Sequence, residues 1–195
     1  MRLKRLARGI EPDWRRGRVP ASLRPGPEMA DWLFDLDSLT KRLKRAGSFR
    51  VVVLRQRLER PLFCERRALG LPDRGLALVR QVHLLCDDKV KVYARSVLPF
   101  ALLTGGGRGL AKLGGRPLGE RLFRDKSMRR SPAEISPVQP GDLFYQWGVT
   151  AQVKHEGQVW GRRSVFKLAD QPLLVNEVFL PPLPNSIGFR IKHKV

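Results

Sequence analysis

The chain has 195 residues, of which 42% are hydrophobic, and its 38 Lys and Arg against 18 Asp and Glu give a formal net charge of +20. This length and composition predict one folded domain with a substantial core, and the longest apolar run, residues 97–103, is too short to span a membrane. The charge favours an anionic partner, but it does not choose among nucleic acid, an anionic membrane surface and a small anionic substrate.

Residues 1–27 contain eight Arg or Lys and four prolines, a composition that predicts a basic, flexible N-terminal arm. The basic start leads into Gly9 and Pro12 rather than an apolar segment, so we expect no secretory signal and a cytoplasmic protein. Two cysteines and three scattered histidines show no metal-ligand spacing, so the sequence predicts no metal site.

Residues 28–36 repeat apolar side chains at helical spacing, and a second helix is expected after Asp37 and Ser38, ending at Gly47. Strand patterns follow over 48–58 and 77–85, and Asp87 and Asp88 predict a hairpin turn into a third strand that ends near residue 99. Residues 58–73 are expected to be irregular and exposed. The pattern is that of an antiparallel meander with one helix-turn-helix flap.

The glycine cluster at 105–109 lacks the residues that a phosphate-binding loop requires. Short helices are expected over 110–113 and 118–123, hinged at 114–117, as a second helix-turn-helix flap. Residues 124–158 are interpreted as a surface insertion, and 185–195 as a basic C-terminal tail. The remaining span, 28–184, is expected to be a single domain.

Residues 159–181 predict two strands joined by a turn near Asp170. Glu177 lies in the middle of the second, otherwise apolar strand, where an ionised carboxylate is costly unless it is paired or hydrogen-bonded. Three interpretations are open: Glu177 lies on a solvated face, it is neutralised by a structural arginine, or it lies in a ligand pocket.

Arg80 is the counterpart of Glu177, a charge embedded in an apolar strand. A guanidinium in a cavity can bind a carboxylate through two hydrogen bonds, and Arg95 and the pair Arg162-Arg163 are further candidates. The signatures of nucleophilic catalysis and of paired catalytic carboxylates are absent. The residues therefore favour a closed pocket for a small carboxylate, with chemistry based on orientation and electrostatics.

Several blocks, in order along the chain, resemble the chorismate–pyruvate lyase family. They are Asp-Ser-Leu-Thr-Lys-Arg at 37–42, Val-Arg at 79–80, Ala-Arg-Ser-Val-Leu-Pro at 94–99, Leu-Gly at 113–114, Arg-Pro-Leu-Gly at 116–119, Leu-Phe at 122–123, Trp-Gly-Arg-Arg-Ser at 160–164 and Leu-Leu-Val-Asn-Glu-Val-Phe-Leu-Pro at 173–181. The last two blocks are the most specific.

The resemblance implies an α+β fold in which an antiparallel sheet of about six strands and two helix-turn-helix flaps enclose an internal ligand cavity. It implies conversion of chorismate to 4-hydroxybenzoate and pyruvate, the first committed step of ubiquinone biosynthesis, without a cofactor or metal. By position, Arg80 matches the arginine that holds the aromatic carboxylate, and Glu177 matches the glutamate at the 4-hydroxyl. Leu39 and Leu118 match the flap corners whose backbone amides face the ligand carboxylate.

Two alternatives to the lyase stay open. The first is a non-catalytic sensor of small aromatic acids on the same fold, and the second is a nucleic-acid-binding protein driven by net charge alone. No nucleic-acid-binding motif accompanies the charge, so no specific nucleic acid is expected as a partner. A monomer is expected, together with a weak electrostatic association with an anionic membrane surface.

Overall fold

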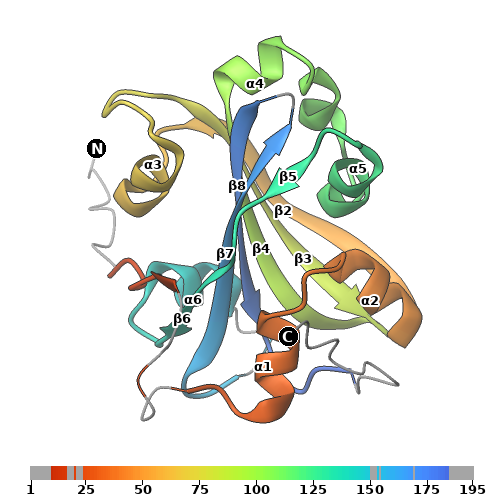
Figure 1. Cartoon of the computed structure of the whole chain (residues 1–195). Coiled ribbons are helices and arrows are strands. Elements are labelled where there is room, and N and C mark those ends of the chain that lie inside the picture. The colour runs from red at the N-terminus through yellow and green to blue at the C-terminus, as the bar shows by residue number, and fades with distance from the viewer. Residues whose placement is uncertain are drawn as a thin grey trace, which may run out of the picture.

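The computed structural model describes residues 10–16, 20, 24–149, 153, 155–168 and 170–184. Within these residues eight strands form one sheet in the order β1-β6-β7-β8-β4-β3-β2, with β5 paired to β7 beside this path. All pairings between the named strands are antiparallel (Figure 1). The strands are β1 Arg15–Arg16, β2 Phe49–Glu59, β3 Ala77–Cys86, β4 Lys89–Pro99, β5 Arg129–Arg130, β6 Glu134–Val138, β7 Val159–Leu168 and β8 Gln171–Phe179.

The helices lie on both sides of this sheet, which makes the fold α+β as expected. They are α1 Pro27–Leu33, α2 Leu39–Ala46, α3 Phe63–Leu69, α4 Phe100–Thr104, the 3₁₀ helix η2 Arg108–Lys112, α5 Leu118–Arg124 and α6 Leu143–Gly148. The expectation of about six strands is wrong, because the sheet has eight. The two additional strands, β1 and β5, contain two residues each, too few for an alternating pattern to reveal.

The hairpins follow the expected turn chemistry. Asp87 and Asp88 join β3 to β4 with φ of 49° and 57°, the left-handed pair of a type I′ turn, which matches the twist of the flanking strands. Asp170 has φ of 62° in the turn between β7 and β8. Aspartate tolerates this conformation better than most side chains, so these residues fix the register of the two long hairpins.

The alternation of side chains divides the sheet into two faces, which we call the pocket face and the opposite face. On the pocket face, Trp32 and Leu43 from α1 and α2 pack with one hydrophobic cluster, and Leu110 and Leu122 from η2 and α5 pack with another. On the opposite face, α6 and α3 cover the strands through separate clusters that include Phe144 and Leu69 respectively.

Two segments differ from their expectation as surface structure. Residues 58–73 contain α3, whose Glu65 is fully buried. Residues 124–158 contribute β5, β6 and α6, with Ile135 and Phe144 among the most buried core residues. Local sequence hides this role, because both segments bury short apolar or charged groups against strands that lie far away in the chain.

Part of the expected N-terminal arm is fixed on the sheet. Arg15 and Arg16 pair with β6, and the Trp14 ring packs edge-on against Phe144 with centroids 5.7 Å apart. The Glu11 carboxylate accepts hydrogen bonds from the first backbone amides of α3, at 3.0 and 2.8 Å. Residues 10–16 are thus an integral part of the fold, and the expected tail at 185–195 lies outside the described residues.

Candidate functional site

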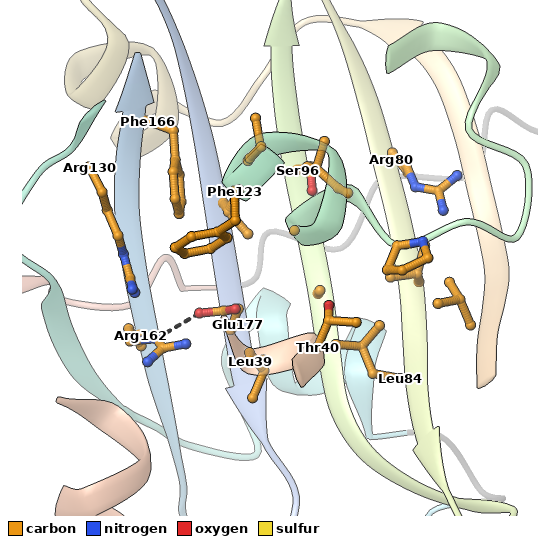
Figure 2. A pocket seen from close by; sticks show the side chains of 18 of the residues that line it. Leu39, Thr40, Arg80, Leu84, Ser96, Phe123, Arg130, Arg162, Phe166 and Glu177 are labelled. Carbon is orange, nitrogen blue, oxygen red and sulfur yellow. Dashed lines mark hydrogen bonds and ion pairs between the residues drawn. The ribbon is translucent and has the colours of Figure 1, made fainter. Parts of the chain in front are cut away.

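A cavity lies on the pocket face, where the two hydrophobic clusters meet beneath the N-terminal ends of α2 and α5 (Figure 2). About 620 Å³ of space not filled by protein atoms lies in this cavity and its mouth, and part of that space is open solvent. Most of its lining is apolar, and the charged side chains of Arg80, Arg130, Arg162 and Glu177 are set into that lining. Such a site suits a small ligand with an apolar body and a few charged groups.

Arg80 projects from β3 into this lining and is 2% exposed. Its Nη1 donates to Gln56 Oε1 at 3.1 Å, and its Nη2 donates to the backbone oxygen of Arg116 at 3.3 Å. No carboxylate among the described residues forms an ion pair with it, and burial lowers the pKa of the guanidinium. Arg80 is therefore a buried cation held by neutral oxygens, an arrangement that favours binding of an anion.

Glu177 projects from β8 into the same cavity, and its side chain is 13% exposed. Arg162, directly opposite on β7, donates from Nε to Glu177 Oε2 at 2.7 Å. The Nη1 of Arg162 also donates to backbone oxygens of Trp32 and Asp35, both at 3.0 Å, near the C-terminal end of α1. Arg162 is thus a neutralising arginine, as one of the open interpretations anticipated, yet Glu177 still faces the pocket.

The sheet register places Arg80 and Glu177 on the same face. Arg80 pairs with Ser96 on β4, while Glu177 pairs with Ala94, two residues earlier on that strand. With strands about 4.8 Å apart and a rise of about 3.4 Å per residue, the two Cα atoms lie roughly 12 Å apart. The two residues therefore line opposite ends of one cavity, with the Arg80 guanidinium held towards Gln56 and Arg116 (Figure 2).

Leu39 and Leu118 are the first residues of α2 and α5, and both line the cavity. Ser38 caps α2 by accepting a hydrogen bond from the Lys41 amide at 3.4 Å. The two helix starts lie close together, since a Cβ on Gly119 would meet Thr40 Oγ1 at 3.2 Å. The first amides of a helix lack intrahelical acceptors, so both helices bring unpaired donors to the edge of the cavity.

The other two candidate arginines lie on the opposite face. Arg95 is 2% exposed and donates to both Glu65 oxygens, from Nε at 2.8 Å and from Nη2 at 3.0 Å. Arg163 pairs with Glu134 at 2.5 Å. Both guanidiniums are occupied by carboxylates away from the cavity, so neither joins Arg80 and Glu177.

Sequence reasoning missed three contributors to the site. Arg130 lies on the two-residue strand β5 and resembles a solvent-exposed charge in the sequence. Phe123 and Phe166 pack edge to face, with centroids 6.2 Å apart, and line the cavity. Their neighbours in sequence give no sign of a shared wall, because Phe123 lies on α5 and Phe166 on β7.

Comparison with known proteins identifies a family that matches most of the chain. The model of the family described as chorismate lyase matches residues 14–187. A protein of Thiobacillus denitrificans named "Probable chorismate pyruvate-lyase" is 43% identical over 168 residues, covering 86% of this chain and 90% of its own length. One with the same name from Methylococcus capsulatus is 44% identical over 155 residues, covering 78% and 94%.

Solved structures share the fold at low identity. The ligand-binding domain of a putative GntR-family transcriptional regulator from Bordetella bronchiseptica superposes with a TM-score of 0.54 at 17% identity, covering 74% of this chain and 91% of that one. PhnF from Mycobacterium smegmatis gives a TM-score of 0.54 at 13% identity, covering 75% and 65%. These similarities concern the arrangement of the sheet and helices only.

Proposed function

Because this chain belongs to the chorismate lyase family, we propose that it converts chorismate to 4-hydroxybenzoate and pyruvate without a cofactor, the first committed step of ubiquinone biosynthesis. The observation that carries the proposal is that Arg80 and Glu177 line the same cavity. A buried cation with no carboxylate partner among the described residues lines one end of the cavity, an inward carboxylate lines the other, and aromatic side chains are part of the same lining.

In this proposal the substrate ring lies between the two charges. Arg80 binds the ring carboxylate through its guanidinium, assisted by the backbone amides of Leu39 and Leu118 at the two helix starts. Glu177 contacts the 4-hydroxyl with Oε1, since Oε2 is the oxygen that accepts the hydrogen bond from Arg162. The Glu177 carboxylate can accept a hydrogen bond or a proton.

The reaction breaks two bonds on neighbouring ring carbons. The C4–H bond gives its proton to an acceptor while the C3–O bond breaks with its electron pair on the departing enolpyruvate oxygen, and the ring becomes aromatic. Enolpyruvate then takes up one proton and becomes pyruvate, so no oxidant or second substrate is needed. We propose Glu177 as the acceptor near C4 and Arg80 as the group that orients the ring.

Incubation of the purified chain with chorismate tests this function. We expect 4-hydroxybenzoate, followed by its ultraviolet absorbance, and an equal amount of pyruvate, followed with lactate dehydrogenase and NADH. Because a closed pocket also holds its product, release is expected to be slow. Saturable binding of 4-hydroxybenzoate without any turnover of chorismate would instead support the alternative, a non-catalytic sensor of small aromatic acids.

We further propose a cytoplasmic monomer that associates weakly with anionic membrane surfaces and binds no specific nucleic acid. The support is the net charge of +20, which attracts acidic lipid headgroups in proportion to their surface charge. No helix in the described residues is both long and apolar enough to cross a bilayer. Sedimentation with phosphatidylglycerol vesicles at low salt, lost at moderate salt, is the expected result, and a failure to sediment at any salt would contradict it.

A further inference from the structure

Arg130 is a charged side chain of the cavity wall to which the family resemblance gave no role. It lies on β5, which pairs with β7 through Arg130 and Phe166, and its guanidinium carbon stands 5.4 Å from the centre of the Phe166 ring. Figure 2 shows its side chain extending along the wall towards Arg162, at the Glu177 end of the cavity and away from Arg80.

Neutral oxygens hold the Arg130 guanidinium in place. Nε donates to Ser164 Oγ at 3.2 Å, and Nη1 donates to the backbone oxygens of Leu36 at 3.1 Å and Asp35 at 3.4 Å. Among the described residues no carboxylate forms an ion pair with Arg130. Burial and the neighbouring charge of Arg162 lower the pKa of Arg130, but an arginine remains charged at neutral pH.

The charges of the cavity are unbalanced. Arg80, Arg130 and Arg162 line it as cations, and Glu177 is the inward carboxylate, because the other acidic residue of the lining, Asp37, is exposed. Three cations against one carboxylate leave two positive charges. Arg162 is already paired with Glu177, so the uncompensated cations are Arg80 at one end and Arg130 at the other.

We propose that Arg130 binds the second carboxylate of the substrate, that of the enolpyruvyl side chain, in a subsite beside Glu177. This inference rests on the proposed function. If Arg80 holds the ring carboxylate and Glu177 contacts the hydroxyl on C4, the enolpyruvyl group on the adjacent carbon C3 extends from the Glu177 end of the ring. Among the described residues, Arg130 is the cation at that end that forms no ion pair with a carboxylate, although the charges of Glu177 and Asp35 act on it.

The subsite also has a role in the bond-breaking step. When the C3–O bond breaks, its electron pair passes to the enolpyruvate oxygen, so the leaving group gains negative charge beside its own carboxylate. A fixed guanidinium near that group stabilises the developing charge without rearranging. Arg130 thus distinguishes the dicarboxylate substrate from the monocarboxylate product, which has lost the group that Arg130 holds.

The test compares two ligands on three proteins. The ligands are 4-hydroxybenzoate and 3-(carboxymethoxy)-4-hydroxybenzoate. The second ligand carries an additional carboxylate at the end of a short ether side chain on the ring carbon next to the hydroxyl. The proteins are the unmodified chain, Arg130→Gln and the matched control Arg129→Gln. Arg129 precedes Arg130 on β5, is exposed, and donates to backbone oxygens of Lys126 and Met128 and to no other residue that the structure describes.

We expect the unmodified chain and Arg129→Gln to bind the dicarboxylate at least about 10-fold more tightly than 4-hydroxybenzoate, since charge-assisted hydrogen bonds are the strong ones. In Arg130→Gln this preference is expected to vanish while the affinity for 4-hydroxybenzoate changes less than about threefold. For chorismate, kcat/KM is expected to fall about 10- to 100-fold, and Arg130→Lys is expected to recover part of the loss.

Each contrary result has a defined meaning. If the unmodified chain does not prefer the dicarboxylate, or if Arg130→Gln keeps the preference, the subsite is absent. If Arg130→Gln loses affinity for both ligands equally, Arg130 only supports the wall structurally, and the proposal is overturned. A chain that prefers the dicarboxylate but does not convert chorismate would retain the subsite and contradict the proposed function instead.

Discussion

Two buried arginines on neighbouring strands, Arg80 on β3 and Arg95 on β4, show how the two faces of the sheet differ. Each is 2% exposed. Arg95 lies on the opposite face, where Glu65 and Glu59 surround its guanidinium and the Trp147 ring stacks 4.7 Å from it. Arg80 lies on the pocket face, where a side-chain amide oxygen and a backbone oxygen are its partners among the described residues.

The surroundings also shift the pKa values of the two guanidiniums in opposite directions. Burial lowers the pKa of Arg80. Burial acts on Arg95 in the same sense, but the charge and hydrogen bonds of Glu65, together with Tyr93 and Glu59, raise the pKa of Arg95 overall. A paired cation is part of the structure, whereas an unpaired one keeps its capacity to bind an anion. The comparison therefore supports our proposal that the opposite face contributes stability and the pocket face binds the ligand.

Breaking the pair on the opposite face should have the largest effect, and the effect should be on folding. Glu65→Gln keeps the shape of the side chain but leaves Arg95 buried with only the more distant Glu59, so we expect the free energy of unfolding to fall by roughly 3 kcal/mol. Denaturant titration measures this loss. The matched control is Glu134→Gln, whose partner Arg163 is more exposed, with an expected loss below about 1 kcal/mol.

Ligand binding by the folded Glu65→Gln protein provides a second part of this test. Because Glu65 lies on the other side of the sheet from the cavity, the Kd for 4-hydroxybenzoate should stay within about threefold of the unmodified value at a temperature where the variant is folded. A normal free energy of unfolding combined with lost ligand binding would reverse the assignment of the two faces.

Replacing Arg80, the arginine without a carboxylate partner among the described residues, should reduce ligand binding and leave folding intact. We expect Arg80→Met to weaken binding of 4-hydroxybenzoate and chorismate several hundredfold, because a ligand carboxylate would be buried without its cation, at a cost of roughly 3 to 5 kcal/mol. Isothermal titration calorimetry measures the affinity. Stability should be unchanged or slightly higher, since the substitution removes an uncompensated buried charge. A destabilised variant that binds normally would make Arg80 a structural residue like Arg95.

Glu177→Gln separates binding of the hydroxyl from proton transfer. If Glu177 accepts the C4 proton, as proposed, kcat for chorismate should fall about 100-fold or more, measured under saturating substrate. The amide can still bond to the 4-hydroxyl, so affinity for 4-hydroxybenzoate should fall less than about 10-fold. A kcat within tenfold of the unmodified value would restrict Glu177 to binding and leave the proton acceptor elsewhere.

The smallest expected effect concerns the contact between the two helices over the cavity. Lys44, in the last turn of α2, pairs with Glu120, in the first turn of α5, and this partly exposed ion pair connects the two helices that carry Leu39 and Leu118. Exposed pairs contribute about 0.2 to 1 kcal/mol, so Lys44→Ala should increase the rate of 4-hydroxybenzoate release about two- to fivefold. Stopped-flow displacement measures this rate, and an unchanged rate would show that α2 and α5 do not limit release.

The sequence was sufficient for features that depend on local patterns. The strands around Arg80 and Glu177 and the turns at Asp87-Asp88 and Asp170 were predicted from alternation, apolar runs and turn residues, whereas the α+β class was implied by the family resemblance. The family follows from specific blocks such as Trp-Gly-Arg-Arg-Ser at 160–164, and the comparisons confirm it. The roles assigned to Arg80, Glu177, Leu39 and Leu118 stay predictions, although the structure brings all four to one cavity.

What the sequence could not show depends on contacts between distant segments. Glu65 is buried because its partners are Arg95 and Asn176, 30 and 111 residues away in the chain. Arg130 joins the cavity through two backbone oxygens that lie 94 and 95 residues earlier. No local pattern distinguishes such residues from solvated surface charges, because burial of a charge is decided by the tertiary fold.

The most direct test of the central claim is a crystal structure of the protein with 4-hydroxybenzoate. The account predicts the ligand carboxylate within hydrogen-bonding distance of the Arg80 guanidinium and its hydroxyl beside Glu177, with Arg95 still paired with Glu65 on the other side of the sheet. A ligand bound outside this cavity, or one whose carboxylate avoids Arg80, would contradict the account.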